Sequence, residues 1–278
     1  MGQITLSTLA QLFGTKENEF NEDFLSFYKS IDLSFTCLSK YELDSVIVDV
    51  LKFIDQDKKV VGVDTRKKVW FEGWKENLSS FRRDKNNLNA ITPQFLRPDQ
   101  PVRFKQTFIL PNNPYFERDF SILFQMWFFH KYLKGFSNVY EFGCGSGFNL
   151  LTIANMFPDM NIVGMDFVMS AVDLVNEISH HRSLNIKSFL FDMTEPDYYF
   201  NIEPNSCVFT ACAIEQLSNN YHNFILYLLR KKPALCLHIE PILELYHEKN
   251  LIDYTAISLH KKRKYPIGFL THLRELES

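Results

Sequence analysis

Residues 139–147 read VYEFGCGSG, and this stretch decides how the rest of the chain is interpreted. Its first part is apolar enough for a buried strand, and its second part holds three of the ten glycines in the protein, Gly143, Gly145 and Gly147. Glycine is needed where the backbone turns sharply and a ligand approaches closer than a Cβ atom allows. The helical pattern that follows places the free N–H groups of a helix N-terminus beside the turn. The stretch therefore predicts a strand, a turn and a helix that together bind an adenosine cofactor.

Short apolar runs and amphipathic segments alternate on both sides of this stretch. We expect strands at 138–142, 161–166, 186–191, 206–213 and 234–240, and helices at 116–133, 148–157, 169–181 and 220–231. Strands that are separated by helical crossovers form a parallel sheet with helices on both faces. The fold class is therefore α/β, with a doubly wound, mostly parallel sheet.

The chain before this sheet has a different pattern. An apolar stripe at helical spacing predicts a mainly helical N-terminal region, and it consists of Leu43, Ile47, Val50, Leu51 and Ile54. Trp70 and Trp74 form either an aromatic substrate wall or a local hydrophobic cluster. Five of the eleven prolines lie between residues 93 and 114, and we expect this density to exclude both regular helix and inner strands. We expect a helical region at 1–92 that serves as a lid or docking surface, a Pro-rich connector at 93–114 and a cofactor-binding domain at 115–278.

The glycine spacing distinguishes between two kinds of cofactor. A dinucleotide fingerprint is G-x-G-x-x-G, which would place its third glycine at Phe148. The chain instead has G-x-G-x-G, preceded by the acidic Glu141. This run resembles the first motif of class I S-adenosylmethionine (SAM) dependent methyltransferases. Two further acids, Asp166 and Asp192, end the next two expected strands, as they do in that family.

The resemblance implies SAM as the cofactor and S-adenosylhomocysteine (SAH) as the product, on a Rossmann-like methyltransferase fold. In the family, the acid that ends the second strand holds both ribose hydroxyls, and the acid that ends the third contacts the adenine amino group. A carboxylate suits the first task because it can accept two O–H donors side by side. The implied cofactor-binding residues are Glu141, Gly143, Cys144, Gly145, Gly147, Asp166, Phe167, Asp192 and Met193.

Candidate catalytic residues follow the fourth and fifth strands, above the expected cofactor. Glu215 stands where many small-molecule methyltransferases of this family have Glu-His, and here Gln216 replaces the histidine. Glu215 either orients the substrate or cofactor, or caps the helix that follows. Glu240 ends the fifth strand before Pro241 and is the better candidate for the pocket.

The acceptor is expected to be a small molecule, methylated on oxygen or nitrogen. The chain lacks the [DN]-P-P-[FY] signature of adenine amino methylation after the fourth strand, and Cys212 lacks the adjoining proline of cytosine methylation. With a net charge of −3, these absences argue against a nucleic-acid partner. A protein or peptide acceptor is the first alternative. A non-catalytic scaffold that binds SAM or a nucleoside is the second, because the histidine is missing and the chain end is short.

The end of the chain offers no credible seventh strand. Residues 254–259 fit either a sixth strand or a helix, so we expect the last strand to be absent, or a partner or second copy to cover the sheet edge. Five cysteines without a C-x-x-C pair predict neither a disulfide framework nor a metal site, and they fit a reducing compartment. The start lacks a secretory signal, and no apolar stretch is long enough for a membrane span. We therefore expect a cytoplasmic protein.

Overall fold

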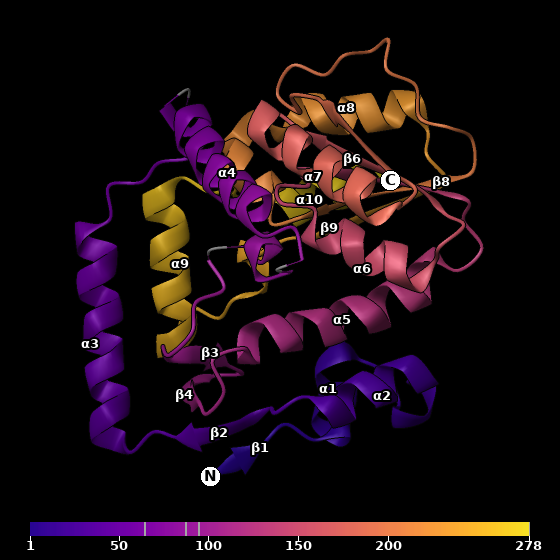
Figure 1. Cartoon of the computed structure of the whole chain (residues 1–278). Helices are drawn as coiled ribbons and strands as arrows, with labels where there is room; N and C mark the ends of the chain where they lie inside the picture. The colour runs from indigo at the N-terminus through magenta and orange to yellow at the C-terminus, as the bar shows by residue number, and fades with distance from the viewer. Residues whose placement is uncertain (64, 87, 94, 278) are drawn as a thin grey trace. The chain divides into compact units, whose positions relative to one another are not determined.

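The computed structural model describes residues 1–63, 65–86, 88–93 and 95–277 (Figure 1). The chain forms two compact units, and each is assembled from two separate stretches. The first unit consists of Met1–Asp55 and Pro93–Lys134, and the second of Gln56–Thr92 and Gly135–Ser278. This division differs from the expected boundaries at 92 and 115. Apolar packing joins residues 78–91 to the helix at 169–182 beside the large sheet, and it joins residues 102–127 to the N-terminal helices.

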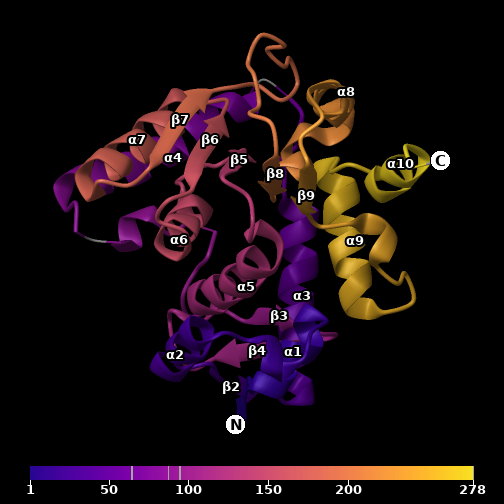
Figure 2. The same cartoon turned by 90° about the vertical axis from the view of Figure 1, so that its right-hand side faces the viewer.

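The second unit contains a five-stranded parallel sheet in the order β7-β6-β5-β8-β9 (Figure 2). Its strands are β5 (Asn138–Phe142), β6 (Asn161–Asp166), β7 (Ile186–Leu190), β8 (Ser206–Ala211) and β9 (Leu235–Ile239). Numbered from β5, the order is 3-2-1-4-5, that of a Rossmann-type sheet. The strand order reverses between β5 and β8. The expected α/β fold class is therefore confirmed.

The helices of this unit lie between and after the strands. They are α4 (Thr65–Arg83), η2 (Leu88–Ile91), α6 (Phe148–Met156), α7 (Met169–Arg182), η3 (Ile214–Tyr221), α8 (His222–Lys231), η4 (Leu243–Leu245), α9 (Leu251–Arg263) and α10 (Phe269–Glu275). Residues 254–259 belong to α9, so the helical alternative is the correct one for them. Within the described residues no strand follows β9, as expected for a sheet without its last strand.

An aromatic core packs between this sheet and α8. Phe142 of β5 lies 4.9 Å from Phe191 and 4.9 Å from Phe224, measured between ring centroids. Tyr227 lies 5.2 Å from Phe191, and none of these four rings is more than 4% exposed. Because β5 is the central strand, this core fixes the end of the strand from which the glycine turn starts.

The first unit combines a small antiparallel sheet with helices. Its elements are β1 (Gly2–Gln3), α1 (Leu6–Phe13), η1 (Glu17–Glu19), α2 (Glu22–Ser30), β2 (Ser34–Cys37), α3 (Lys40–Gln56), β3 (Val102–Phe104), β4 (Thr107–Pro111) and α5 (Phe116–Leu133). The strand order is β1-β2-β4-β3, so β4 is an inner strand. The expectation that the Pro-rich connector excludes an inner strand is therefore wrong. Pro101 precedes β3 and Pro111 ends β4, so the prolines flank the ladder and do not interrupt it.

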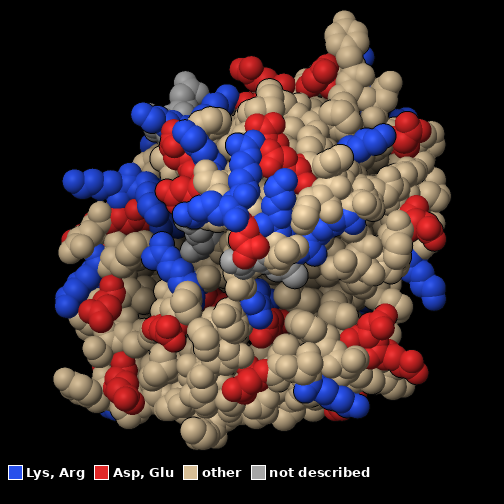
Figure 3. All heavy atoms as spheres, in the orientation of Figure 1, with Lys and Arg blue, Asp and Glu red and all other residues tan. Residues whose placement is uncertain are grey.

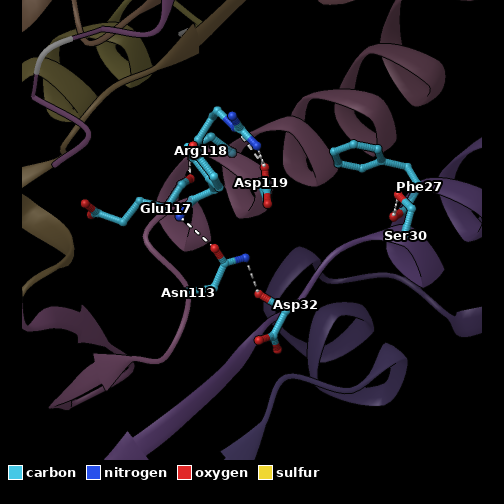
Figure 4. Close-up of polar contacts among 9 residues, drawn as sticks. Phe27, Ser30, Asp32, Asn113, Glu117, Arg118 and Asp119 are labelled. Carbon is cyan, nitrogen blue, oxygen red and sulfur yellow. Dashed lines mark hydrogen bonds and ion pairs between the residues drawn. The ribbon is translucent and has the colours of Figure 1, made fainter. Parts of the chain in front are cut away.

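Polar contacts fix the start of α5 (Figure 4). The Nδ2 group of Asn113 donates to the carbonyl of Asp32 at 3.2 Å, and Asn113 Oδ1 accepts from the N–H of Tyr115 at 3.0 Å. Asp119, which is 3% exposed, pairs with Arg118 at 2.7 Å, and burial raises the pKa of Asp119. The proline-containing segment is thus ordered at the point where it enters α5.

Candidate functional site

The turn between β5 and α6 is held by hydrogen bonds to the end of β6. Gly143, Gly145 and Gly147 all have positive φ angles, of 79°, 52° and 77°. Residues with a Cβ atom rarely adopt such angles, whereas glycine does so readily. The N–H groups of Gly143 and of the next residue donate to the carbonyl of Met165, at 2.7 and 3.0 Å. The N–H of Gly145 donates to Oδ2 of Asp166 at 2.9 Å. The predicted strand, turn and helix therefore form, and the turn is tied to the neighbouring strand.

Two of the three glycines permit close internal packing. A Cβ atom at Gly143 would collide with the Cβ of Ala213, which follows β8. A Cβ atom at Gly147 would lie 2.9 Å from Cγ2 of Val175 on α7. These two positions need glycine because neighbouring elements of the same unit lie against the backbone.

Gly145 faces a different neighbour, the indole of Trp74. A Cβ atom at Gly145 would lie 2.5 Å from Cζ2 of that indole, so the ring of α4 covers the turn. Trp74 also stacks on Trp70, with ring centroids 5.6 Å apart. The sequence left two alternatives for Trp70 and Trp74, an aromatic wall or a local cluster. In the structure they form a stacked cluster, and Trp74 also forms a wall on the glycine turn.

The carboxylate of Asp166 lies beneath the turn and is 3% exposed. Its Oδ1 accepts from the N–H of Val168 at 3.1 Å, and the N–H of Phe167 also donates to the carboxylate. Burial raises the pKa of Asp166 to about 6, although the backbone donors oppose this shift. Cys144 is buried, and its thiol lies 3.9 Å from Ser188 Oγ. Asp166 therefore fixes the turn through the backbone, and Cys144 points into the unit.

Two polar atoms next to the turn have no partner among the described residues. Oε1 of Glu141 accepts a hydrogen bond from Asn149 at 2.5 Å, but its buried Oε2 has no partner, nor has the Oγ of Ser146. Both residues are 1% exposed. Burial raises the pKa of Glu141 well above its ordinary value, and the negative charge of Asp166 adds to this. Buried polar atoms are normally hydrogen-bonded, so these two fit a site for a polar ligand.

Asp192 follows β7 and is paired with a lysine of α4. Its Oδ2 accepts from Lys67 Nζ at 2.8 Å, and its Oδ1 accepts from the N–H of Thr194 at 2.9 Å. Partial burial raises the pKa of Asp192, but the hydrogen bonds from Lys67 and Thr194 outweigh it and lower the pKa below its ordinary value. Met193 is 6% exposed and belongs to the core. Asp192 is thus an ionised acid at the carboxyl edge of the sheet.

Glu240 caps the helix that follows β8. Its Oε1 accepts from the N–H groups of Ala213 and Ile214, both at 3.1 Å, and its Oε2 accepts from the N–H of Glu215 at 3.4 Å. Burial raises the pKa of Glu240 to about 7. Capping of this helix was one of the two roles expected for Glu215, but the structure places the capping carboxylate at Glu240.

Glu215 lies in a polar network that the sequence did not reveal. Its Oε1 accepts from Gln216 at 2.8 Å, and Tyr265 hydrogen-bonds its carboxyl group. Arg263 donates to Tyr265 at 3.2 Å and to Asp57 at 2.6 Å. Burial and the charge of Glu240 raise the pKa of Glu215 to about 7.

Within the described ranges, no group of three or more His, Cys, Asp or Glu residues is arranged to hold a metal ion. Among the same residues, no helix combines the length and apolar character needed to cross a bilayer.

Comparison with known proteins gives distant structural likenesses. The sequence matches no protein-family profile, and no curated protein sequence matches it. The [4+2]-cyclase SpnF is 19% identical, with a TM-score of 0.30, over 35% of this chain and 36% of the cyclase. Coclaurine N-methyltransferase bound to N-methylheliamine and SAH is 16% identical, with a TM-score of 0.39, over 82% of this chain and 56% of that chain.

A third similar structure is the plantazolicin methyltransferase BpumL in complex with a pentazolic desmethylPZN analogue and SAH. It is 13% identical, with a TM-score of 0.40, over 77% of this chain and 76% of that chain. This chain spans less than two thirds of the cyclase and of coclaurine N-methyltransferase. The strand order of the sheet, and not these likenesses, defines the fold.

Proposed function

We propose that this protein is a SAM-dependent methyltransferase with a small-molecule acceptor, methylated on oxygen or nitrogen. The observation that carries the proposal is the hydrogen bond from Gly145 to Asp166, which joins the glycine turn to the end of the next parallel strand. This turn lies where the strand order reverses, the place where ligands bind in open α/β sheets. Oε2 of Glu141 and Oγ of Ser146 have no partner in the described part of the chain, which supports a polar ligand at the same turn.

In this proposal different site residues bind different parts of the cofactor. Asp166 binds the ribose hydroxyls with the acceptor capacity that its backbone donors leave free. Asp192 binds the adenine amino group once Lys67 releases it. The remaining members line the turn and the strand ends, and they are Glu141, Gly143, Cys144, Gly145, Gly147, Phe167 and Met193. When bound, SAM supplies a methyl group activated by a sulfonium sulfur.

In this proposal Glu215 is the residue that acts on the methyl acceptor. A general base works best when its pKa is close to the operating pH, and the pKa of Glu215 is about 7. We assign Glu215 the task of removing the acceptor proton. Glu240 is a positioning residue in this scheme, since it holds the N-terminus of η3, where Glu215 lies.

Calorimetric titration with SAH tests the cofactor site. We expect micromolar binding by the wild-type protein and a loss of at least about 100-fold in D166A, because each hydrogen bond to a carboxylate is worth roughly 1.5–3 kcal/mol. The matched control is D173A, which removes an exposed acid of α7 and leaves affinity unchanged. No binding by the wild type, or equal affinities of wild type and D166A, would contradict the proposal.

A non-catalytic binding protein is the second candidate. Two observations favour it: Trp74 covers Gly145, and Gln216 stands at the place of the family histidine. Incubation with labelled SAM and a metabolite panel or cell extract separates the candidates. Label in small molecules supports the first proposal, and label confined to macromolecules supports a protein or peptide acceptor. Binding without transfer supports the non-catalytic candidate.

Whichever of these candidates is correct, we propose that the edge of β9 binds a partner or a second copy.

A further inference from the structure

The inner face of α4 carries a column of stacked planar groups that ends on the glycine turn. Arg66, Trp70 and Trp74 follow one another at four-residue spacing, so they share one face of the helix. The guanidinium of Arg66 lies 5.3 Å from the ring centroid of Trp70, and Trp70 stacks on Trp74 at 5.6 Å. Beyond Trp74 the next contact is Gly145. The indole of Trp74 therefore occupies the space that the absent side chain of Gly145 leaves open.

Buried polar atoms on α4 and at the glycine turn have no hydrogen-bond partner among the described residues. On α4, the Nε of Arg66 and the Nε1 of Trp70 are buried donors with no partner among the described residues. At the turn, Glu141 Oε2 and Ser146 Oγ are in the same state. Buried polar groups without partners are costly. A ligand that carries both donors and acceptors, such as a nucleoside with an amino-acid tail, would remove that cost.

The two halves of α4 are held in different ways. The C-terminal half is anchored by an apolar cluster in which Leu78 and Phe81 pack with Leu174 and Ile178 of α7. In the N-terminal half, Lys67 forms a half-exposed ion pair with Asp192. Side-chain hydrogen bonds in this half run from Ser170 to the carbonyl of residue 71 and from Arg66 to residue 216. Exposed ion pairs contribute little, so the N-terminal half is the part that can leave the turn while the apolar anchor stays in place.

We propose that Trp74 determines access to the nucleoside site: its indole fills the ligand-facing side of Gly145, and the N-terminal half of α4 moves away when the cofactor binds. The same movement separates Lys67 from Asp192, so both ends of the proposed site become accessible together. This inference rests on the proposed function, because the ligand is the SAM-type nucleoside assigned to the turn. A ligand that must first open a closed state binds with an affinity lowered by the fraction of open molecules.

Two measurements with SAH test this proposal on the full chain. In calorimetric titrations we expect W74A to bind SAH at least ten-fold more tightly than the wild type. The matched control is F71A, which removes a 38% exposed aromatic ring of the same helix and leaves the affinity unchanged. In a W70F/W127F variant, where Trp74 is the remaining tryptophan, SAH should increase acrylamide quenching of its fluorescence at least two-fold.

The outcomes separate this proposal from the proposed function. If the wild type binds SAH but W74A binds equally or more weakly, Trp74 is a fixed wall and the proposal is overturned. Binding that leaves the quenching of Trp74 unchanged also overturns it, and this measurement decides the matter if W74A does not fold. If the wild type does not bind SAH at all, the proposed function fails, and this inference fails with it.

Discussion

Three carboxyl groups at the carboxyl edge of the sheet hold their protons more tightly than exposed ones do. Burial raises the pKa of Asp166 to about 6 and the pKa values of Glu215 and Glu240 to about 7. A carboxyl group whose pKa is raised by folding stabilises the folded state below its unfolded pKa. That contribution is lost as the pH rises through the folded value. For Glu215 this window runs from the ordinary value of 4.5 to about 7.

The variant E215Q tests this sign. At pH 8 the wild type carries a buried negative charge at Glu215, beside that of Glu240, whereas glutamine is neutral. We therefore expect the melting temperature of E215Q relative to wild type to be higher at pH 8 than at pH 5, by a few degrees. Thermal unfolding followed by circular dichroism at both pH values measures this difference. The control E195Q, at an exposed site, should show no such change, and an equal offset of E215Q at both pH values would refute the assignment.

At the scale of the element, α4 has two distinct faces. Its outer face is charged and solvated. Figure 3 shows one face of the molecule, on which Lys and Arg side chains cluster in the upper half with Asp and Glu side chains among them. The exposed basic residues of α4 are Lys67, Lys68, Lys75, Arg82 and Arg83. The helix lies along α7 (Figure 1). Its inner face packs there through apolar side chains. The free energy that holds α4 in place therefore comes from its inner face.

Two substitutions on α4 compare these faces. Leu78 is 5% exposed, so L78A should lower the free energy of unfolding by about 2–5 kcal/mol. Arg82 forms an ion pair with Glu177, but its side chain is 55% exposed, so R82A should cost less than about 1 kcal/mol. Urea unfolding monitored by far-UV circular dichroism measures both. Similar losses in the two variants would mean that the ion pair anchors the helix as strongly as the apolar contact does.

At the scale of the whole molecule, the chain passes between the two units three times. Residues 56–92 carry α4 into the unit of the large sheet, although they precede the proline-containing segment. Residues 93–134 join the N-terminal segment instead, and β4 pairs with β2 there. Neither unit is therefore a continuous piece of sequence, and a cut at either expected boundary divides both.

A truncated chain of residues 93–278 tests this arrangement. It retains the whole five-stranded sheet, but it loses α4 from one unit and β2 from the other. We expect it to lack a cooperative thermal transition and to aggregate on size-exclusion chromatography, because it exposes Leu174 and Ile178 and leaves the edge of β4 that faces β2 unpaired. The full chain under identical conditions is the reference. A monodisperse fragment that melts cooperatively would show that residues 93–278 fold without α4 and β2.

Local sequence patterns alone specify the parallel sheet, the glycine turn between β5 and α6, and the acids at the carboxyl ends of β6 and β7, Asp166 and Asp192. These features depend on local patterns: apolar periodicity, positive φ angles that favour glycine, and residues at fixed distances along the chain. Contacts formed in the folded chain place Trp74 over Gly145, make Glu240 the cap of η3, and bring residues 56–92 into the unit of the large sheet. These outcomes depend on contacts between residues far apart in the chain. The same apolar and polar side chains could have found other partners, and the packing of the folded unit selects among them.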